Sequence, residues 1–222
     1  MKRILLTICA TYLTLGSISA QGIKPVEPDA ANAIEALQVA GYELFNFDLS
    51  SLNDKTYEIE VFVKEADSAG IKEKTRFGMG PTRKFLKDMP EEYRSNFTPI
   101  DSESGLYKQV SKMGLYIIPK NDSTVLASFS FGKSHGGSIP LKLRPLERDS
   151  HMCMYTSRPF KLDEFKSGID IPLMLYGSFW FDQKINGHRF CGDNEIDTNL
   201  STEILKYIPH YYIIGIRLTE TD

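Results

Sequence analysis

The feature that most constrains the fold is a recurring alternation of apolar and polar residues. In residues 57–64, apolar side chains occupy every second position, namely Tyr57, Ile59, Val61 and Val63. Residues 45–49 show the same period of two. This period is typical of antiparallel strands with one face in the core and one in water, because buried parallel strands are apolar on both faces. Since the short polar segment 50–55 joins the two runs, they are predicted to form an antiparallel hairpin.

Strand signals recur along the rest of the chain. Residues 120–123 contain Asn and Asp, which favour turns, and a second hairpin is predicted where they join two further strands. The segment 211–218 is apolar on both faces, which predicts a central strand. These patterns predict a mainly β fold, a two-sheet antiparallel β-sandwich with one or two short helices, formed as a single domain by residues 42–222. The strands predicted after the first hairpin are 114–119, 124–131, 139–143, 151–155, 171–181 and 211–218.

Two segments carry helix signals. Residues 29–40 place apolar side chains on one helical face, with Asp29 suited to the N-cap and Gly41 to the position just past the end. A helical turn is also predicted after Pro90, because proline and acidic residues favour a helix start. Residues 21–41 are therefore predicted to be an N-terminal lead-in and a short helix. The shared face comprises Ala33, Ile34, Leu37 and Ala40.

Residues 1–20 have the order of a secretory signal peptide. A basic head precedes a charge-free apolar run at 4–16, and small residues end the segment at Ala20. The run is shorter than the roughly twenty apolar residues of a membrane-spanning helix, so cleavage is predicted rather than a retained anchor. The protein is therefore predicted to be exported, and to be periplasmic, bound to the cell surface or secreted.

The charge balance argues against nucleic acid as a partner. The chain has 26 lysines and arginines against 29 aspartates and glutamates, a net charge of -3, and loss of the leader would make it more acidic. A protein that binds polyanions needs a basic stripe. Basic and acidic residues are instead mixed throughout this chain, which indicates a solvated surface of mixed charge.

Two cysteines, Cys153 and Cys191, remain after the predicted cleavage. In an exported protein such a pair favours a disulfide bond. The alternatives are two buried thiols or half of a metal site, although no Cys-x-x-Cys spacing supports the metal.

The pattern Gly-x-Ser-x-Gly around Ser134 raises the possibility of a serine hydrolase. In a nucleophile elbow, a helix follows the serine directly and supplies backbone donors for the oxyanion. Here the residues after Ser134 contain glycines and Pro140 and predict a loop and another strand. A hydrolase that uses Ser134 is therefore kept as an alternative function.

An acidic turn near the C-terminus has spacing typical of the start of a calcium-binding loop. Asp193, Glu195 and Asp197 place carboxylates on alternate residues. In a twelve-residue EF-hand loop that starts at Asp193, the sixth position would be Thr198 instead of the required glycine. The twelfth would be Ile204 instead of glutamate, so an EF-hand is excluded. These three residues are kept as candidate metal ligands beside a solvated turn, and no cofactor is predicted.

An aromatic cluster lies in the segment 176–181. Tyr176 and Trp180 are candidate ligand-binding residues, because aromatic rings form binding faces for sugars and for lipid headgroups. Alternation places them with Ser178 on one face of a strand, and core packing is the competing interpretation. A membrane-active or pore-forming sandwich that uses these rings is a further alternative.

Two segments resemble a known group of proteins. Residues 42–61, which begin Tyr-Glu-Leu-Phe-Asn-Phe-Asp-Leu, and residues 208–216, Ile-Pro-His-Tyr-Tyr-Ile-Ile-Gly-Ile, resemble exported uncharacterised β-rich proteins of gut Bacteroidetes that carry a domain of unknown function. The resemblance implies export and a β fold, and it implies no activity.

These patterns together favour an exported, non-enzymatic binding or interaction protein. No acid-base pair, nucleophile or metal motif meets the structural requirements of its chemistry, and β-sandwiches often act as recognition scaffolds. The expected ligand is a glycan, a peptide or another protein, with membrane contact as the less favoured alternative.

Overall fold

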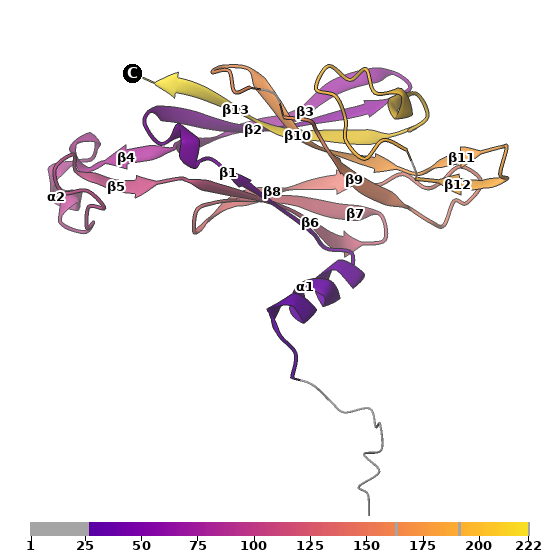
Figure 1. Cartoon of the computed structure of the whole chain (residues 1–222), viewed down its shortest axis with the longest axis horizontal. Helices are drawn as coiled ribbons and strands as arrows, with labels where there is room; N and C mark the ends of the chain where they lie inside the picture. Colours follow the sequence, from indigo (N-terminus) through magenta and orange to yellow (C-terminus); the bar gives the residue numbers. More distant parts are fainter. Residues whose placement is uncertain (1–26, 163, 191, 222) are drawn as a thin grey trace, which may run out of the picture.

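The computed structural model describes residues 27–162, 164–190 and 192–221. The predicted signal peptide lies outside these residues, and it stays a prediction. Two antiparallel sheets pack face to face (Figure 1). The four-stranded sheet has the order β1 (Glu43–Asp48), β6 (Lys112–Asn121), β7 (Thr124–Phe131) and β8 (Ser134–Lys142). The five-stranded sheet has the order β3 (Gly70–Pro81), β2 (Thr56–Asp67), β13 (Tyr211–Thr221), β10 (Asp170–Ser178) and β9 (Tyr155–Pro159). The predicted mainly β, antiparallel fold is confirmed.

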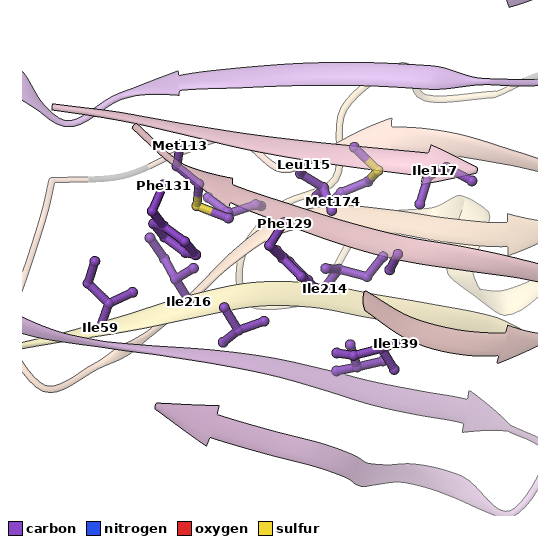
Figure 2. Packing of buried hydrophobic residues seen from close by; sticks show 14 of the residues in the cluster. Ile59, Met113, Leu115, Ile117, Phe129, Phe131, Ile139, Met174, Ile214 and Ile216 are labelled. Carbon is purple, nitrogen blue, oxygen red and sulfur yellow. The ribbon is translucent and has the colours of Figure 1, made fainter. Parts of the chain in front are cut away.

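The main core fills the space between the two sheets (Figure 2). Alternation along β2 directs its apolar positions into this core, while Glu58 and Glu60 point to the opposite face. From the four-stranded sheet, Met113, Leu115 and Phe129 are fully buried in the same cluster. Burial of this apolar surface is the principal stabilising contribution to the fold.

Strand β13 is central, as its apolar residues predict. It pairs with β2 on one side and with β10 on the other. Tyr212 and Ile214 lie in the main core, whereas Tyr211 and Ile213 contribute to a second apolar cluster on the outer face of the same sheet. Residues 196–208, which include the 3-10 helix η3 (Glu203–Lys206), cover this second cluster with Ile196, Ile204 and Ile208.

The hairpin predicted from the first two alternating runs is wrong. β1 pairs with β6, and β2 pairs with β3 and β13, so the two runs lie in opposite sheets. The short 3-10 helix η1 (Ser50–Leu52) connects the sheets where a turn was predicted. Alternation identifies the wet face of a strand but does not identify its partner. Strand β3 has no such alternation because it is an edge strand rich in charged residues, a common protection against aggregation.

The other predicted elements agree with the structure to different degrees. β6 and β7 form the second predicted hairpin. The strand predicted at 151–155 starts only at Tyr155, and the one predicted at 171–181 is broken at Phe179 into β10 and β11 (Trp180–Asp182). β11 pairs with β12 (Gly187–Arg189) in a hairpin at one end of the molecule (Figure 1).

The helical segments lie outside the sandwich. α1 (Ala30–Val39) begins at Asp29, which forms a capping box with Asn32, and ends before Gly41 at a φ of 84°. None of its residues is buried, so its apolar face does not pack on the sheets as the pattern would suggest. α2 (Glu91–Arg94) follows Pro90 in an arm opposite the β11–β12 end (Figure 1). This arm also contains β4 (Arg83–Phe85), η2 (Leu86–Asp88) and β5 (Leu106–Gln109).

Candidate functional site

A cleft of about 850 Å³ opens at one end of the sandwich, where β1 of one sheet faces β9 of the other. This volume lies within the range typical of small-molecule sites. The cleft, called the end cleft below, is lined by side chains from segments far apart in the sequence. They include Glu43 of β1, Asn121 of β6, Tyr155 of β9 and Tyr176 of β10, with Cys153 and Phe179 beside them.

Glu43 supplies a carboxyl group to the end cleft. Every second residue of β1 faces the core, as Phe45 and Phe47 do. Glu43 is two residues before Phe45 and therefore lies on the same face. Burial raises the pKa of Glu43, and hydrogen bonds with Ser157 offset this only in part. Burial raises the pKa of Tyr176, and the negative charge of Glu43 raises it further. The carboxyl group therefore has an increased tendency to be neutral and to act as a hydrogen-bond donor.

Behind the wall of the end cleft, three side chains form a partly buried chain of hydrogen bonds. The hydroxyl of Tyr155 lies 2.6 Å from Nδ1 of His210, and Nε2 of His210 lies 2.9 Å from Glu65. His210 is only 2% exposed. Burial lowers the pKa of His210 despite its bond to Glu65, so the ring is neutral near pH 7. The tautomer that satisfies both contacts carries its proton on Nε2 and accepts from Tyr155.

These hydrogen bonds orient Tyr155 and do not make its hydroxyl more acidic. Its hydroxyl accepts a hydrogen bond from the backbone N–H of Arg144 at 3.0 Å and donates to His210. Burial raises the pKa of Tyr155 to about 12, so the phenol stays protonated at neutral pH. Burial alone would raise the pKa of Glu65, but hydrogen bonds from His210 and Lys74 lower it to about 2. The hydrogen bonds with Arg144 and His210 fix the position of the Tyr155 ring beside the cleft.

Sequence reasoning missed Glu43, Glu65 and His210, although a signal for the two glutamates was present. Glu65 follows Val63 in the apolar period of β2, and Glu43 precedes Phe45 in that of β1. A carboxylate on the apolar face of an alternating strand needs a partner or a function, because an unpaired buried charge is costly. His210 has no comparable pattern around it.

Tyr176 and Trp180, the predicted ligand-binding pair, are separated in the structure. Tyr176 is 6% exposed, lies in the main core and lines the end cleft. Trp180 packs against the second apolar cluster and stacks on Tyr207 at 6.2 Å between ring centroids. The predicted shared face is wrong because the strand breaks at Phe179, which lines the end cleft instead.

The rings of the aromatic segment make separate contacts, and Phe179 stacks on Phe190 at 4.8 Å between ring centroids. Phe181 contacts Arg148 and His188. Over the part of the chain that the structure describes, none of the helices has the length and apolar character needed to cross a bilayer.

Lys161 lies within electrostatic range of all three candidate metal ligands, Asp193, Glu195 and Asp197. The carboxylate of Asp197 forms an ion pair with Lys161 at 2.9 Å, and Asp193 and Glu195 are exposed. Among the described residues, no group of three His, Cys, Asp or Glu side chains is arranged to hold a metal ion. The last carboxylate of the acidic turn is already paired with Lys161, and metal binding by the three acids stays a prediction.

Ser134 lies in strand context, as the residues after it predict. It is exposed and begins β8, directly after the β7–β8 turn at Gly132. Because a strand follows and no helix does, the backbone geometry of a nucleophile elbow is missing at this residue.

The predicted disulfide stays a prediction. Cys153 is half-buried at the end cleft, where burial raises the pKa of its thiol, and Cys191 lies outside the described residues. If the bond forms, protein exported without reductant and then denatured should show no titratable thiol at these positions, and two after reduction. Two thiols before reduction would contradict the bond.

Comparison with known proteins identifies a family and gives no activity. No curated protein and no solved structure matches the chain. A family model described as a domain of unknown function, DUF5041, matches residues 14–220. This match covers nearly all of the sandwich, while export and a Bacteroidetes origin stay predictions from the sequence. The chain belongs to the DUF5041 family.

Proposed function

We propose that this protein is an exported, non-enzymatic binding protein whose end cleft takes a short glycan. The observation that carries the proposal is the composition of one cleft, which combines aromatic rings with groups that both donate and accept hydrogen bonds. Sugars present apolar C–H faces beside hydroxyl groups, and they therefore bind where rings and polar side chains lie together.

The charged residues Lys120 and Asp122 line the end cleft with opposite signs, and the polar groups beside them suit an uncharged ligand. Burial raises the pKa of Glu43, and its carboxyl oxygens accept hydrogen bonds in either protonation state and donate one when the group is protonated. The amides of Gln38 and Asn121 also line the cleft and combine both roles. Tyr155, held by His210, supplies a ring whose position is set before a ligand arrives. Such preorganisation lowers the entropic cost of binding.

The test is a screen of the purified protein against an oligosaccharide panel, followed by calorimetric titration of any sugar that binds. Glu43→Ala and Phe179→Ala should each weaken binding about fivefold, the effect of losing roughly 1 kcal/mol of hydrogen bonding or ring contact. Phe181→Ala is the matched control, because that ring contacts Arg148 outside the cleft. The proposal fails if no sugar in the panel binds, or if Phe181→Ala weakens binding as much as Phe179→Ala.

A further inference from the structure

A second cleft, of about 920 Å³, lies at the other end of β1. It is called the lateral cleft here, and it shares no lining residue with the end cleft. Its floor is formed by nearly buried core side chains, and half-exposed or exposed apolar side chains such as Leu162 and Ile169 surround it. The apolar residues that line it include Phe47, Leu49, Phe165, Leu173, Ile216 and Leu218.

The roof of the lateral cleft is held in place by the sheet beneath it. In the segment 164–169, the backbone N–H of Gly168 donates to the carbonyl of Leu218 at 2.8 Å. The hydroxyl of Ser167 accepts from the N–H of Glu220 at the same distance. The ring of Phe165 meets that of Tyr57 edge to face, 5.3 Å between centroids. The cleft therefore exists before any ligand binds, which is typical of small-molecule sites.

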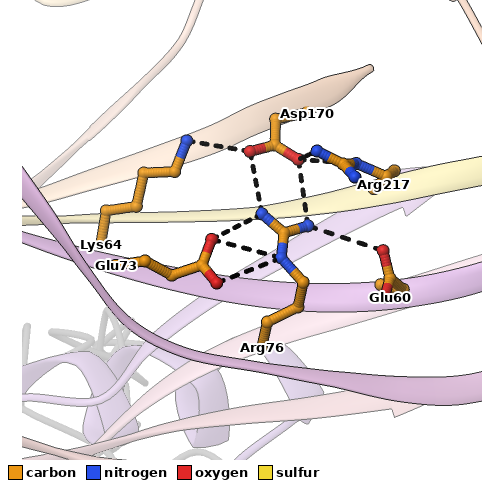
Figure 3. A network of polar contacts seen from close by, with 6 residues as sticks. All are labelled: Glu60, Lys64, Glu73, Arg76, Asp170 and Arg217. Atoms are coloured by element: carbon orange, nitrogen blue, oxygen red, sulfur yellow. Dashed lines mark hydrogen bonds and ion pairs between the residues drawn. The ribbon is translucent and has the colours of Figure 1, made fainter. Parts of the chain in front are cut away.

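The charges around the lateral cleft select against anions. Asp48 and Glu164 line it, and of the described lining residues only Lys166 is a cation. A third acid, Asp170, is already paired with Lys64, Arg76 and Arg217 on the outer face of the five-stranded sheet (Figure 3). A ligand carboxylate or sulfonate would meet two unneutralised acids for one lysine, and like charges at short range repel.

We propose that the lateral cleft binds the apolar part of an uncharged small molecule, an alkyl chain or an aromatic ring system. The apolar floor supplies the hydrophobic contribution to affinity, and the acidic rim discriminates against anionic amphiphiles. This site is independent of the glycan proposal, because the two clefts contain different residues.

The test uses N-phenyl-1-naphthylamine, an uncharged probe that fluoresces in apolar surroundings. Wild-type protein should give a saturable rise in fluorescence, and an anionic anilinonaphthalene sulfonate should bind at least tenfold more weakly. Leu162→Asp and Ile169→Asp should each weaken probe binding at least tenfold, because both side chains line the cleft and are more than half exposed. The matched control is Ile185→Asp, an exposed apolar residue on the β11–β12 turn, which should leave binding unchanged.

A further variant separates loss of the site from loss of the fold. Ser51→Trp places an indole at the exposed mouth of the lateral cleft and should reduce probe binding while the far-UV spectrum stays that of the wild type. The proposal is overturned if wild-type protein gives no saturable signal, or if the anionic probe binds as tightly as the uncharged one. It is also overturned if Ile185→Asp weakens binding as much as Ile169→Asp.

Discussion

Phe129→Ala is expected to lower the free energy of unfolding by about 3–5 kcal/mol, the range found for aromatic residues removed from a packed core. Phe129 is fully buried between the sheets and meets Phe77 edge to face, 6.3 Å between ring centroids (Figure 2). The cost combines the lost transfer of the ring from water with the cavity that remains, because neighbouring strands relax only partly.

Urea denaturation followed by circular dichroism measures this change through the midpoint and slope of the transition. The matched control is Phe97→Ala, in the arm next to α2, where the ring is 42% exposed. That variant should lose less than about 1 kcal/mol, because less apolar surface leaves the folded interior. Equal losses for the two variants would contradict the position of Phe129 in the main core.

Asp170→Asn is expected to lower the free energy of unfolding by about 2 kcal/mol. The carboxylate of Asp170 lies 2.9 Å from the ammonium of Lys64 and 3.0 Å from the guanidinium of Arg76, and it also pairs with Arg217 (Figure 3). Its side chain is 19% exposed, so solvent screens these pairs only in part. An uncharged asparagine removes the carboxylate that three cations share, and although Arg76 keeps Glu60 and Glu73, repulsion among the cations opposes the pairing of β2, β3, β10 and β13.

The pH dependence gives an independent check on this network. Burial alone would raise the pKa of Asp170, but hydrogen bonds from Arg76 and Lys64 lower it to about 2. Because the folded-state pKa lies below the unfolded value of about 4, the stabilisation is fully present above pH 4 and is lost as the pH falls toward 2. The difference between wild type and Asp170→Asn should therefore shrink over this interval.

The control for Asp170→Asn is Glu220→Gln, which removes one exposed ion pair with Lys55 at 2.7 Å. Exposed single pairs contribute little to stability, so its unfolding midpoint should match that of the wild type. Should Asp170→Asn unfold at the wild-type midpoint as well, the network would be a set of solvated contacts with no stabilising role.

The local elements of this protein were predictable where a pattern repeats within a few residues. The alternation along β2, the two apolar faces of β13 and the cap of α1 at Asp29 were each read correctly, because side-chain periodicity and capping depend on near neighbours. The apolar face of α1 shows the limit of such patterns. Periodicity placed apolar residues on one helical face, and the structure leaves that helix outside the sandwich with none of its residues buried.

The candidate site was predictable only in part. Tyr176 was identified from the aromatic cluster, and it lines the end cleft, whereas Trp180 lies against a different cluster. A one-residue break at Phe179 separates them, and a period of two cannot show such a break. Glu43 and Glu65 are charged residues at positions where the alternation of their strands predicts apolar ones. This departure from the pattern is the signal in the sequence that identifies them.

The sequence by itself determined the mainly β class, the wet and dry faces of its strands and the central place of β13, because these follow from side chains that repeat along one segment. Tertiary structure alone decided that β1 pairs with β6, and that Glu65 meets His210 across 145 residues. Strand pairing and clefts arise from hydrogen bonds and contacts between distant segments. Their free energy depends on how two sheets close around a shared core, and local patterns do not contain it.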